Sequence, residues 1–196
     1  KGIRFGLAEF RENDDVSGED PNGGFLSVDL ERASPSHAAN LEAHTKNTDP
    51  GTESPLGEAL FQLYTYFMPR TTADMPKGQD GITSFPVYSY EKDGDHTTNT
   101  NKYLDDPVQY ACQKSFILIV TDGTPDRDDF DNDPTDTAQG FTSFGNLIGD
   151  YNPDGEIEVP GTTDEVAWYL DDIAKFAAEN DMRPDFTGKQ CIDTYT

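Results

Sequence analysis

Alternating apolar and polar positions predict two strands near the start of the chain. Apolar side chains occupy every second position from Ile3 to Leu7 and again from Leu26 to Leu30. This two-residue period is typical of a strand with one buried face. An acidic, glycine-containing stretch, residues 11–24, separates the two runs. We therefore expect an antiparallel pair of strands with a long connection.

Two later segments have the 3.6-residue period of amphipathic helices. The first, SPLGEALFQLYTYF at residues 54–67, opens with Ser54 as a capping residue and Pro55 at the first helical position. The second runs from about residue 164 to residue 180 and ends before Arg183-Pro184, where proline disfavours helix. Its apolar stripe consists of Val166, Tyr169, Leu170, Ile173 and Ala177.

A short apolar run between these helices predicts a parallel strand. Residues 116–120 read FILIV and are followed by Thr121 and Asp122. An unbroken run of this kind is typical of a strand buried on both faces, and its carboxyl end is where open α/β sheets bind ligands. The final CIDTYT, residues 191–196, reads as the start of another strand.

The order of elements predicts one α/β domain over residues 1–196, because strands alternate with helices. Two long polar stretches interrupt this order, at about residues 69–111 and 124–162. We interpret both as insertions, since they are rich in acidic, glycine and other turn-forming residues.

The net charge narrows the classes of partner. The chain has 38 acidic and 14 basic residues, a net charge of -24. Such a chain repels nucleic acid and anionic membrane surfaces, and attracts divalent cations that prefer oxygen ligands. Solubility alone, or adaptation to salt, is the simpler explanation. No apolar stretch reaches the ~20 residues of a membrane span, so we expect none.

The cysteines and the lack of catalytic motifs bear on the class of protein. Cys112 and Cys191 fit an exported protein with one disulfide, or else two unrelated free thiols. The three histidines lie in polar segments, and no nucleophile, zinc-protease or phosphate-binding motif occurs. We therefore do not expect an enzyme.

Two sets of oxygen-bearing residues are candidate cation sites. Ser54 at a helix start and Asp122 at a strand end would meet at the sheet edge and suit a hard divalent cation. A plain helix cap and a turn residue before Gly123 are the alternatives. Acidic runs at residues 126–136 and 93–95 are weaker candidates, since such runs are usually solvated.

The second set lies in DYNPDGEIE. Asp150, Asn152 and Asp154 stand at positions 1, 3 and 5 of a calcium-loop template, with Gly155 at the sharp turn. Position 12 is Gly161 and no helix precedes the loop, so this is a related loop and not an EF-hand. An ordinary turn is the alternative. The coordination shell would be completed by Glu156, Glu158 or Asp164.

Three segments together resemble a von Willebrand factor type A domain. GIRFGLAEF is similar to that family's second strand, SPLGEAL to its TPLGEAL metal loop, and FILIVTDG to its fourth strand. The resemblance implies a Rossmann-like sheet with flanking helices. It also implies that Ser54 is a hydroxyl ligand and Asp122 the third-loop carboxylate of a metal-ion-dependent adhesion site.

Longer segments resemble the PilY-type proteins of type IV pili. These segments follow one another in the family's order: DPVQYACQKSFILIVTDGTP, GDYNPDGE, YLDDIAKF, DMRPDFTGKQ and TYT. The resemblance implies a protein that is exported through the periplasm to the pilus tip. There it would assist assembly and adhesion, with pilin or minor pilin subunits and a host or abiotic surface as partners.

One departure limits this resemblance. The family's first metal loop, Asp-x-Ser-x-Ser at the end of the first strand, does not occur in the sequence. We therefore expect an incomplete domain that lacks its first strand and is truncated at both ends. Calcium remains a candidate, whereas Mg²⁺ or Mn²⁺ would bind only if the missing loop is supplied.

The resemblance also bears on the cysteines and leaves other functions open. In the A-domain order the strands that follow Cys112 and Cys191 are neighbours, which implies a disulfide between these residues. A calcium-binding extracellular structural or matrix protein is the main alternative function. A metal-dependent hydrolase is a more distant one.

Overall fold

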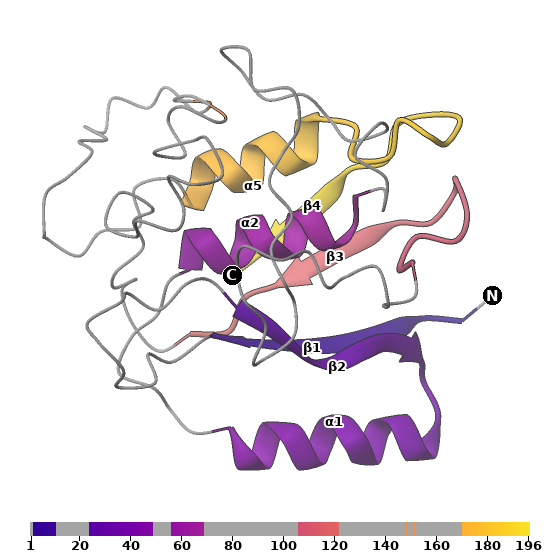
Figure 1. Cartoon of the computed structure of the whole chain (residues 1–196), viewed down its shortest axis with the longest axis vertical. Coiled ribbons are helices and arrows are strands. Elements are labelled where there is room, and N and C mark those ends of the chain that lie inside the picture. Colours follow the sequence, from indigo (N-terminus) through magenta and orange to yellow (C-terminus); the bar gives the residue numbers. More distant parts are fainter. Residues whose placement is uncertain are drawn as a thin grey trace, which may run out of the picture.

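The computed structural model describes residues 2–10, 24–48, 56–68, 106–121, 148, 151 and 170–196 (Figure 1). Within these residues the chain is a mixed α/β protein. Its elements are β1 (Arg4–Phe10), β2 (Gly24–Arg32), α1 (Pro35–Asn47), α2 (Leu56–Tyr66), β3 (Ser115–Leu118), α5 (Leu170–Glu179) and β4 (Ile192–Tyr195).

The first two strands pair as the alternation predicts. β1 and β2 are antiparallel, with Arg4 opposite Arg32 and Phe10 opposite Gly24. The register shifts on both sides of Leu7. Near this irregularity a side chain on Gly6 would meet the Val28 carbonyl oxygen at 2.9 Å, so glycine permits the close approach of the strands.

The other two strands form a parallel pair. Ser115 lies opposite Ile192 and Leu118 opposite Tyr195, and Ile119 N–H extends the ladder to the Tyr195 carbonyl at 2.8 Å. The predictions of a strand within residues 116–120 and of another in the final six residues are confirmed. β1, β3 and β4 run in the same direction, while α2 runs against them (Figure 1).

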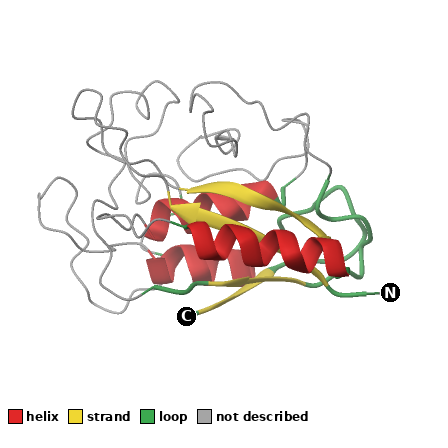
Figure 2. Cartoon of the chain, turned by 90° about the horizontal axis from the view of Figure 1, so that it is seen from below, coloured by secondary structure: helices red, strands yellow, loops and turns green. Residues whose placement is uncertain are grey.

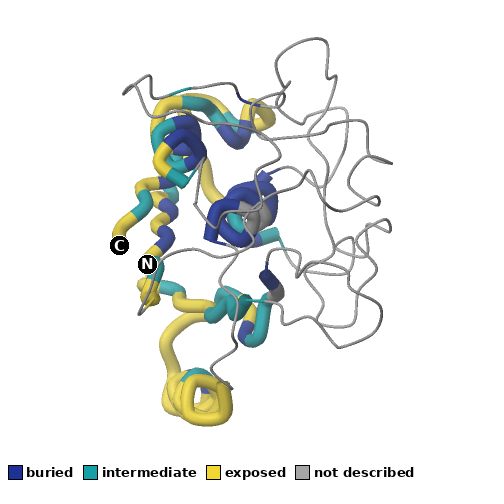
Figure 3. Tube along the Cα trace, turned by 90° about the vertical axis from the view of Figure 1, so that its left-hand side faces the viewer, coloured by how far each residue is buried: buried dark blue, intermediate teal, exposed yellow. Residues whose placement is uncertain are grey.

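The hydrophobic core lies where α2, α5 and the inner face of β3–β4 meet. The Tyr64 ring on α2 packs edge-on against the Phe176 ring on α5, with centroids 5.8 Å apart. Burial raises the pKa of Tyr64 well above its ordinary range, so the hydroxyl stays protonated. In Figure 3 the dark, buried parts of the trace gather around α2 and the inner side of α5. Fully buried members include Leu60, Phe61, Tyr64, Met68, Ile148, Ile173, Met182 and Ile192.

The prediction that the β3 run is buried on both faces is wrong. Its side chains alternate, with Ser115 and Ile117 buried and Phe116, Leu118 and Val120 exposed by 54%, 69% and 81%. The inner face packs toward the helices. Among the described residues β3 pairs only with β4, and its outer face stays open beside Tyr195, whose ring centroid lies 6.2 Å from that of Phe116.

Helix α1 was not anticipated by the hydrophobic pattern. Its sequence is polar on nearly all sides, and His37 is its one buried residue. The Ser34 hydroxyl caps it by accepting the His37 N–H at 3.1 Å, with Pro35 at the first helical turn. α1 lies on the opposite side of β1–β2 from α2 (Figures 1 and 2), and β2 contacts both helices. The Ser-Pro start was the available signal.

The predicted limits of the insertions change in two places. Residues 106–111 were assigned to the first insertion, yet Pro107 and Val108 are buried in the body of the domain. Ile148, from the second, is fully buried as well. For the second predicted helix, the structure describes α5 from Leu170 onward, and Val166 and Tyr169 lie outside the described residues. No helix within the described ranges is long and apolar enough to cross a membrane.

Candidate functional site

The predicted metal ligands of the sheet edge flank described elements. Ser54 and Asp122 both lie outside the described residues, as do the acidic runs at 126–136 and 93–95. α2 begins at Leu56, and the strand β3 leads into Val120 and Thr121. The start of α2 and the end of β3 point to the same end of the molecule in Figure 1. The convergence of Ser54 and Asp122 stays a prediction.

The candidate calcium loop is anchored to the core next to its first ligand. Asp150, Asn152 and Asp154 lie outside the described residues, together with Glu156 and Glu158. Tyr151, inside the same loop, packs its ring edge-on against Phe176 with centroids 5.2 Å apart. Asn180 Nδ2 donates a hydrogen bond to the Tyr151 hydroxyl at 3.1 Å. A cation bound at Asp150 would therefore act beside the C-terminal half of α5.

Within the described part of the chain, no three His, Cys, Asp or Glu side chains form a group that could hold a metal ion. The polar network there has another role. It lies in the seam, which we define as residues 106–121 together with residues 181–196, the two segments that end in β3 and β4.

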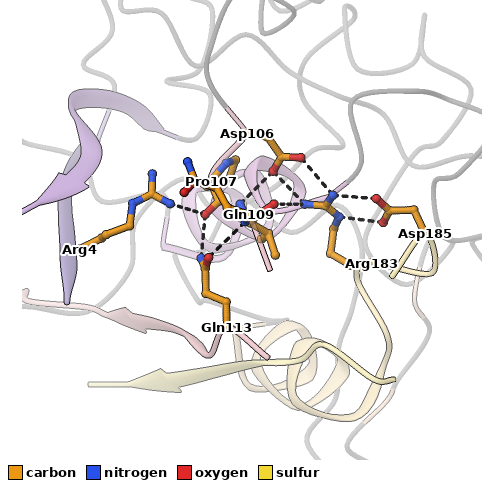
Figure 4. A network of polar contacts seen from close by, with 8 residues as sticks. Arg4, Asp106, Pro107, Gln109, Gln113, Arg183 and Asp185 are labelled. Carbon is orange, nitrogen blue, oxygen red and sulfur yellow. Dashed lines mark hydrogen bonds and ion pairs between the residues drawn. The ribbon is translucent and has the colours of Figure 1, made fainter. Parts of the chain in front are cut away.

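Arg183 is the centre of this network (Figure 4). Its Nη1 and Nη2 donate to Oδ1 and Oδ2 of Asp106 at 2.8 and 3.0 Å. Its Nε and Nη2 donate to Oδ1 and Oδ2 of Asp185 at 2.8 and 2.7 Å, and Nη1 also reaches the Val108 carbonyl at 3.3 Å. The guanidinium carbon lies 4.3 Å from the Phe186 ring centroid. These contacts use all five N–H donors of the guanidinium, so no donor is left for a ligand.

Arg183, Asp106 and Asp185 form a closed ion-pair network, which we call the Arg183 clasp. Burial of Arg183 disfavours its charge, but hydrogen bonds to Asp185 and Asp106 outweigh that effect and raise its pKa. The hydrogen bond from Arg183 lowers the pKa of Asp185 below its usual range. Arg183 is only 2% exposed. A buried cation held between two carboxylates stabilises the arrangement of the two segments and offers no free charge for chemistry.

The same network reaches the first strand pair. Arg4 on β1 donates from Nη1 to the Pro107 carbonyl at 2.7 Å, and from Nη2 to the Leu30 carbonyl on β2. Gln113 Nε2 donates to the same Pro107 carbonyl at 2.7 Å, while its Oε1 accepts the Gln109 N–H at 3.2 Å. Residues far apart in the sequence therefore meet at one carbonyl, as Figure 4 shows.

Sequence reasoning did not find this network. Asp106 and Pro107 were assigned to an insertion, and Arg183 was read only as the residue before a helix-stopping proline. Asp106 and Arg183 are 77 residues apart in the chain, and a local sequence period cannot predict a contact between such distant positions. The available hint was a single basic residue, Arg183, between two aspartates in an acidic chain.

The cysteines lie in the seam as free thiols. Cys112 is exposed, and Cys191 is partly buried. Burial raises the pKa of the Cys191 thiol. The disulfide between them stays a prediction.

Comparison with known proteins finds no matching family, no similar curated protein and no similar solved structure.

Proposed function

We propose that the chain is a type A-like module of a PilY-type protein, secreted to the tip of a type IV pilus, where it assists assembly and adhesion. The ordered series of PilY-like segments supports this proposal. The observation that carries it is that β3 ends and α2 begins at the same end of the molecule (Figure 1). That arrangement suits a cation site built from Ser54 and Asp122.

We infer that both strand pairs belong to one Rossmann-like sheet, in the order β2, β1, an additional strand, β3, β4. β1, β3 and β4 run in one direction (Figure 1), and β1 and β3 do not pair with each other in the described residues. Arg4 on β1 reaches the Pro107 carbonyl only through its long side chain. One more strand between β1 and β3, ~4.8 Å from each, would join the two pairs into one sheet.

The additional strand would bring the ligands that the chain lacks. A helix start favours anions, because its free N–H groups and dipole are positive, so a cation near Ser54 needs more carboxylates than Asp122. An Asp-x-Ser-x-Ser loop at the end of the added strand would supply them. The completed site would bind Mg²⁺ or Mn²⁺ with several waters and take a carboxylate from the partner, a pilin subunit or a surface ligand.

The test uses the full-length protein in the cells that make it. Deleting the gene should lower the number of surface pili at least tenfold. Reintroducing the gene with Asp122→Ala should restore pili, but magnesium-dependent attachment to a surface should fall at least tenfold, because the cation loses its carboxylate ligand. Pili are counted by electron microscopy, and attachment is measured with and without EDTA.

The matched control is Asp29→Ala, which removes an exposed carboxylate from the middle of β2. It should restore both pili and attachment. Unchanged pili and unchanged attachment after gene deletion would contradict the pilus function. Attachment that is equally lost in both aspartate variants would contradict the specific metal site.

A calcium-binding extracellular structural protein is the second candidate, favoured by the anchoring of the candidate calcium loop to α5 through Tyr151. Here millimolar Ca²⁺ should raise the melting temperature, since ligands that bind only the folded state stabilise it. Asp150→Ala should remove most of that rise. If calcium stabilises the protein and gene deletion changes neither pili nor attachment, this second function replaces the first.

A further inference from the structure

The two segments of the seam contact each other at three points, which follow the same order along both segments. Asp106 pairs with Arg183 at 2.8 Å, the Ala111 carbonyl accepts Gln190 Nε2 at 3.0 Å, and Ser115 lies opposite Ile192 in the ladder. Position increases along both segments from one contact to the next. The series therefore holds Gln190 and Ile192 against the segment that contains Ala111 and Ser115.

The two cysteines occupy one interval of this series. Cys112 directly follows Ala111, and Cys191 directly follows Gln190, so the residues preceding the two cysteines are in hydrogen-bond contact. On the other side, Cys191 directly precedes Ile192, which pairs with Ser115. Paired strands are ~4.8 Å apart, and a disulfide requires Cα atoms ~4.4–6.8 Å apart. Formation of the disulfide requires the exposed turn at Cys112 to bring the two Cα atoms within this range.

We propose that Cys112 and Cys191 are an oxidation site at which a disulfide locks the seam between the Arg183 clasp and the β3–β4 ladder. The lock holds the two strands together at their amino ends, opposite the edge where ligands would bind. It is independent of the pilus function, because it needs neither a metal ion nor a partner.

The unequal exposure of the thiols sets the order of the reaction. Cys112 is exposed, whereas Cys191 is partly buried and its pKa is raised by that burial. The Cys112 thiolate attacks one sulfur of a small disulfide such as oxidised glutathione, and one glutathione thiolate leaves. The Cys191 thiolate then attacks the Cys112 sulfur and expels the second glutathione. Two protein thiols are oxidised, one glutathione disulfide is reduced, and both leaving thiolates take up the released protons.

The gain in stability follows from the length of chain that the bond closes. The two cysteines are about 80 residues apart, so the crosslink restricts the unfolded chain strongly. The parallel pair β3–β4 is short, and two-stranded sheets are marginal by themselves. We expect oxidation to raise the melting temperature by about 10 °C.

The experiment treats the purified chain with oxidised glutathione and maps disulfides by mass spectrometry of proteolytic peptides. The wild type should give one crosslinked peptide pair containing Cys112 and Cys191, and a melting temperature that dithiothreitol returns to the reduced value. Cys191→Ser should stop at the mixed disulfide on Cys112. Cys112→Ser should react with glutathione at least tenfold more slowly, because its remaining thiol is partly buried.

Three results would overturn the proposal. One is a wild type that keeps glutathione on Cys112 without passing the bond to Cys191. Another is crosslinking only between different molecules. The third is that Cys112→Ser and Cys191→Ser react with glutathione at equal rates in the folded state. In urea both remaining thiols are unhindered, so equal rates are expected there and serve as the reference.

Discussion

The seam and the N-terminal unit, β1, β2 and α1, hold their parts together in different ways. In the seam, a buried arginine uses every donor on two carboxylates and a carbonyl, next to a parallel ladder and the main core. In the N-terminal unit, the one buried residue of α1 is His37, 4% exposed. Its Nε2 lies 2.7 Å from the Phe5 carbonyl, and its Nδ1 lies 3.6 Å from the exposed Glu31 carboxylate.

How each helix is held in place follows from how much apolar surface it buries. α2 and α5 are held by large apolar faces that share one core, so loss of a single contact leaves many others. α1 has almost no apolar face and depends on a side-chain anchor and on its Ser34 cap. The seam combines both modes, because Arg183 bonds the carbonyl of buried Val108 and directly follows buried Met182. The two regions should therefore respond differently to single substitutions.

The largest effect is expected from Arg183→Ala. The change leaves Asp106 and Asp185 facing each other without a cation. We expect the unfolding free energy to fall by about 3 kcal/mol. This is the lower end of the range for a buried pair, because both carboxylates are partly exposed. Urea unfolding measures the loss. Arg183→Lys should recover only part of it, since an ammonium cannot make two bidentate pairs.

The control for this comparison is Arg32→Ala, which removes an exposed arginine of β2. It should change the unfolding free energy by less than about 0.5 kcal/mol. Equal losses from the two arginine variants would show that the clasp adds nothing beyond an ordinary surface charge.

A smaller and local effect is expected from His37→Ala. The change removes the hydrogen bond to the Phe5 carbonyl and leaves a small cavity between α1 and β1, at a cost of about 1–2 kcal/mol. Amide exchange should quicken in α1 and hardly change in α5. His44→Ala, on the exposed side of the same helix, is the control and should leave exchange unaltered.

The smallest effect concerns acid. The folded pKa of Asp185 lies below its unfolded value of ~3.9, so the unfolded state binds more protons between these two values. The clasp's contribution is then complete above the unfolded pKa and is lost as pH falls through the folded pKa. Asp185→Asn should flatten the fall of stability below about pH 4.

Many other carboxylates titrate in the same range, so the quantity to compare is the difference between wild type and variant. Asp29→Asn on exposed β2 supplies the reference slope. A difference that shrinks toward neutral pH would contradict the assignment, because it would require a raised pKa for Asp185.

Local elements were largely predictable from the sequence, and their exposure was not. The alternation in residues 3–7 and 26–30 identified β1 and β2, and the helical period identified α2 and part of α5. The run FILIV identified β3 but suggested two buried faces, whereas Phe116, Leu118 and Val120 are exposed. An apolar run records which side chains can be buried, but neighbouring elements decide which of them are.

The candidate sites divide in the same way. Ser54, Asp122 and the residues of the candidate calcium loop were proposed from residue type and spacing, which state what chemistry is possible at a local turn. The Arg183 clasp and the Pro107 junction required the fold, because they bring together residues from β1, the segment before β3 and the segment before β4.

By itself the sequence determined the acidic character of the protein, the order of its strands and helices apart from α1, and the positions of its two cysteines, since each depends on composition or a short period. Only the tertiary structure decided that one buried histidine anchors α1 to β1, and that the apolar outer face of β3 is exposed. It also decided that Gln190 bonds the Ala111 carbonyl beside the cysteines. Each of these outcomes is a contact between segments distant in the chain, and such contacts depend on how all the elements pack at once.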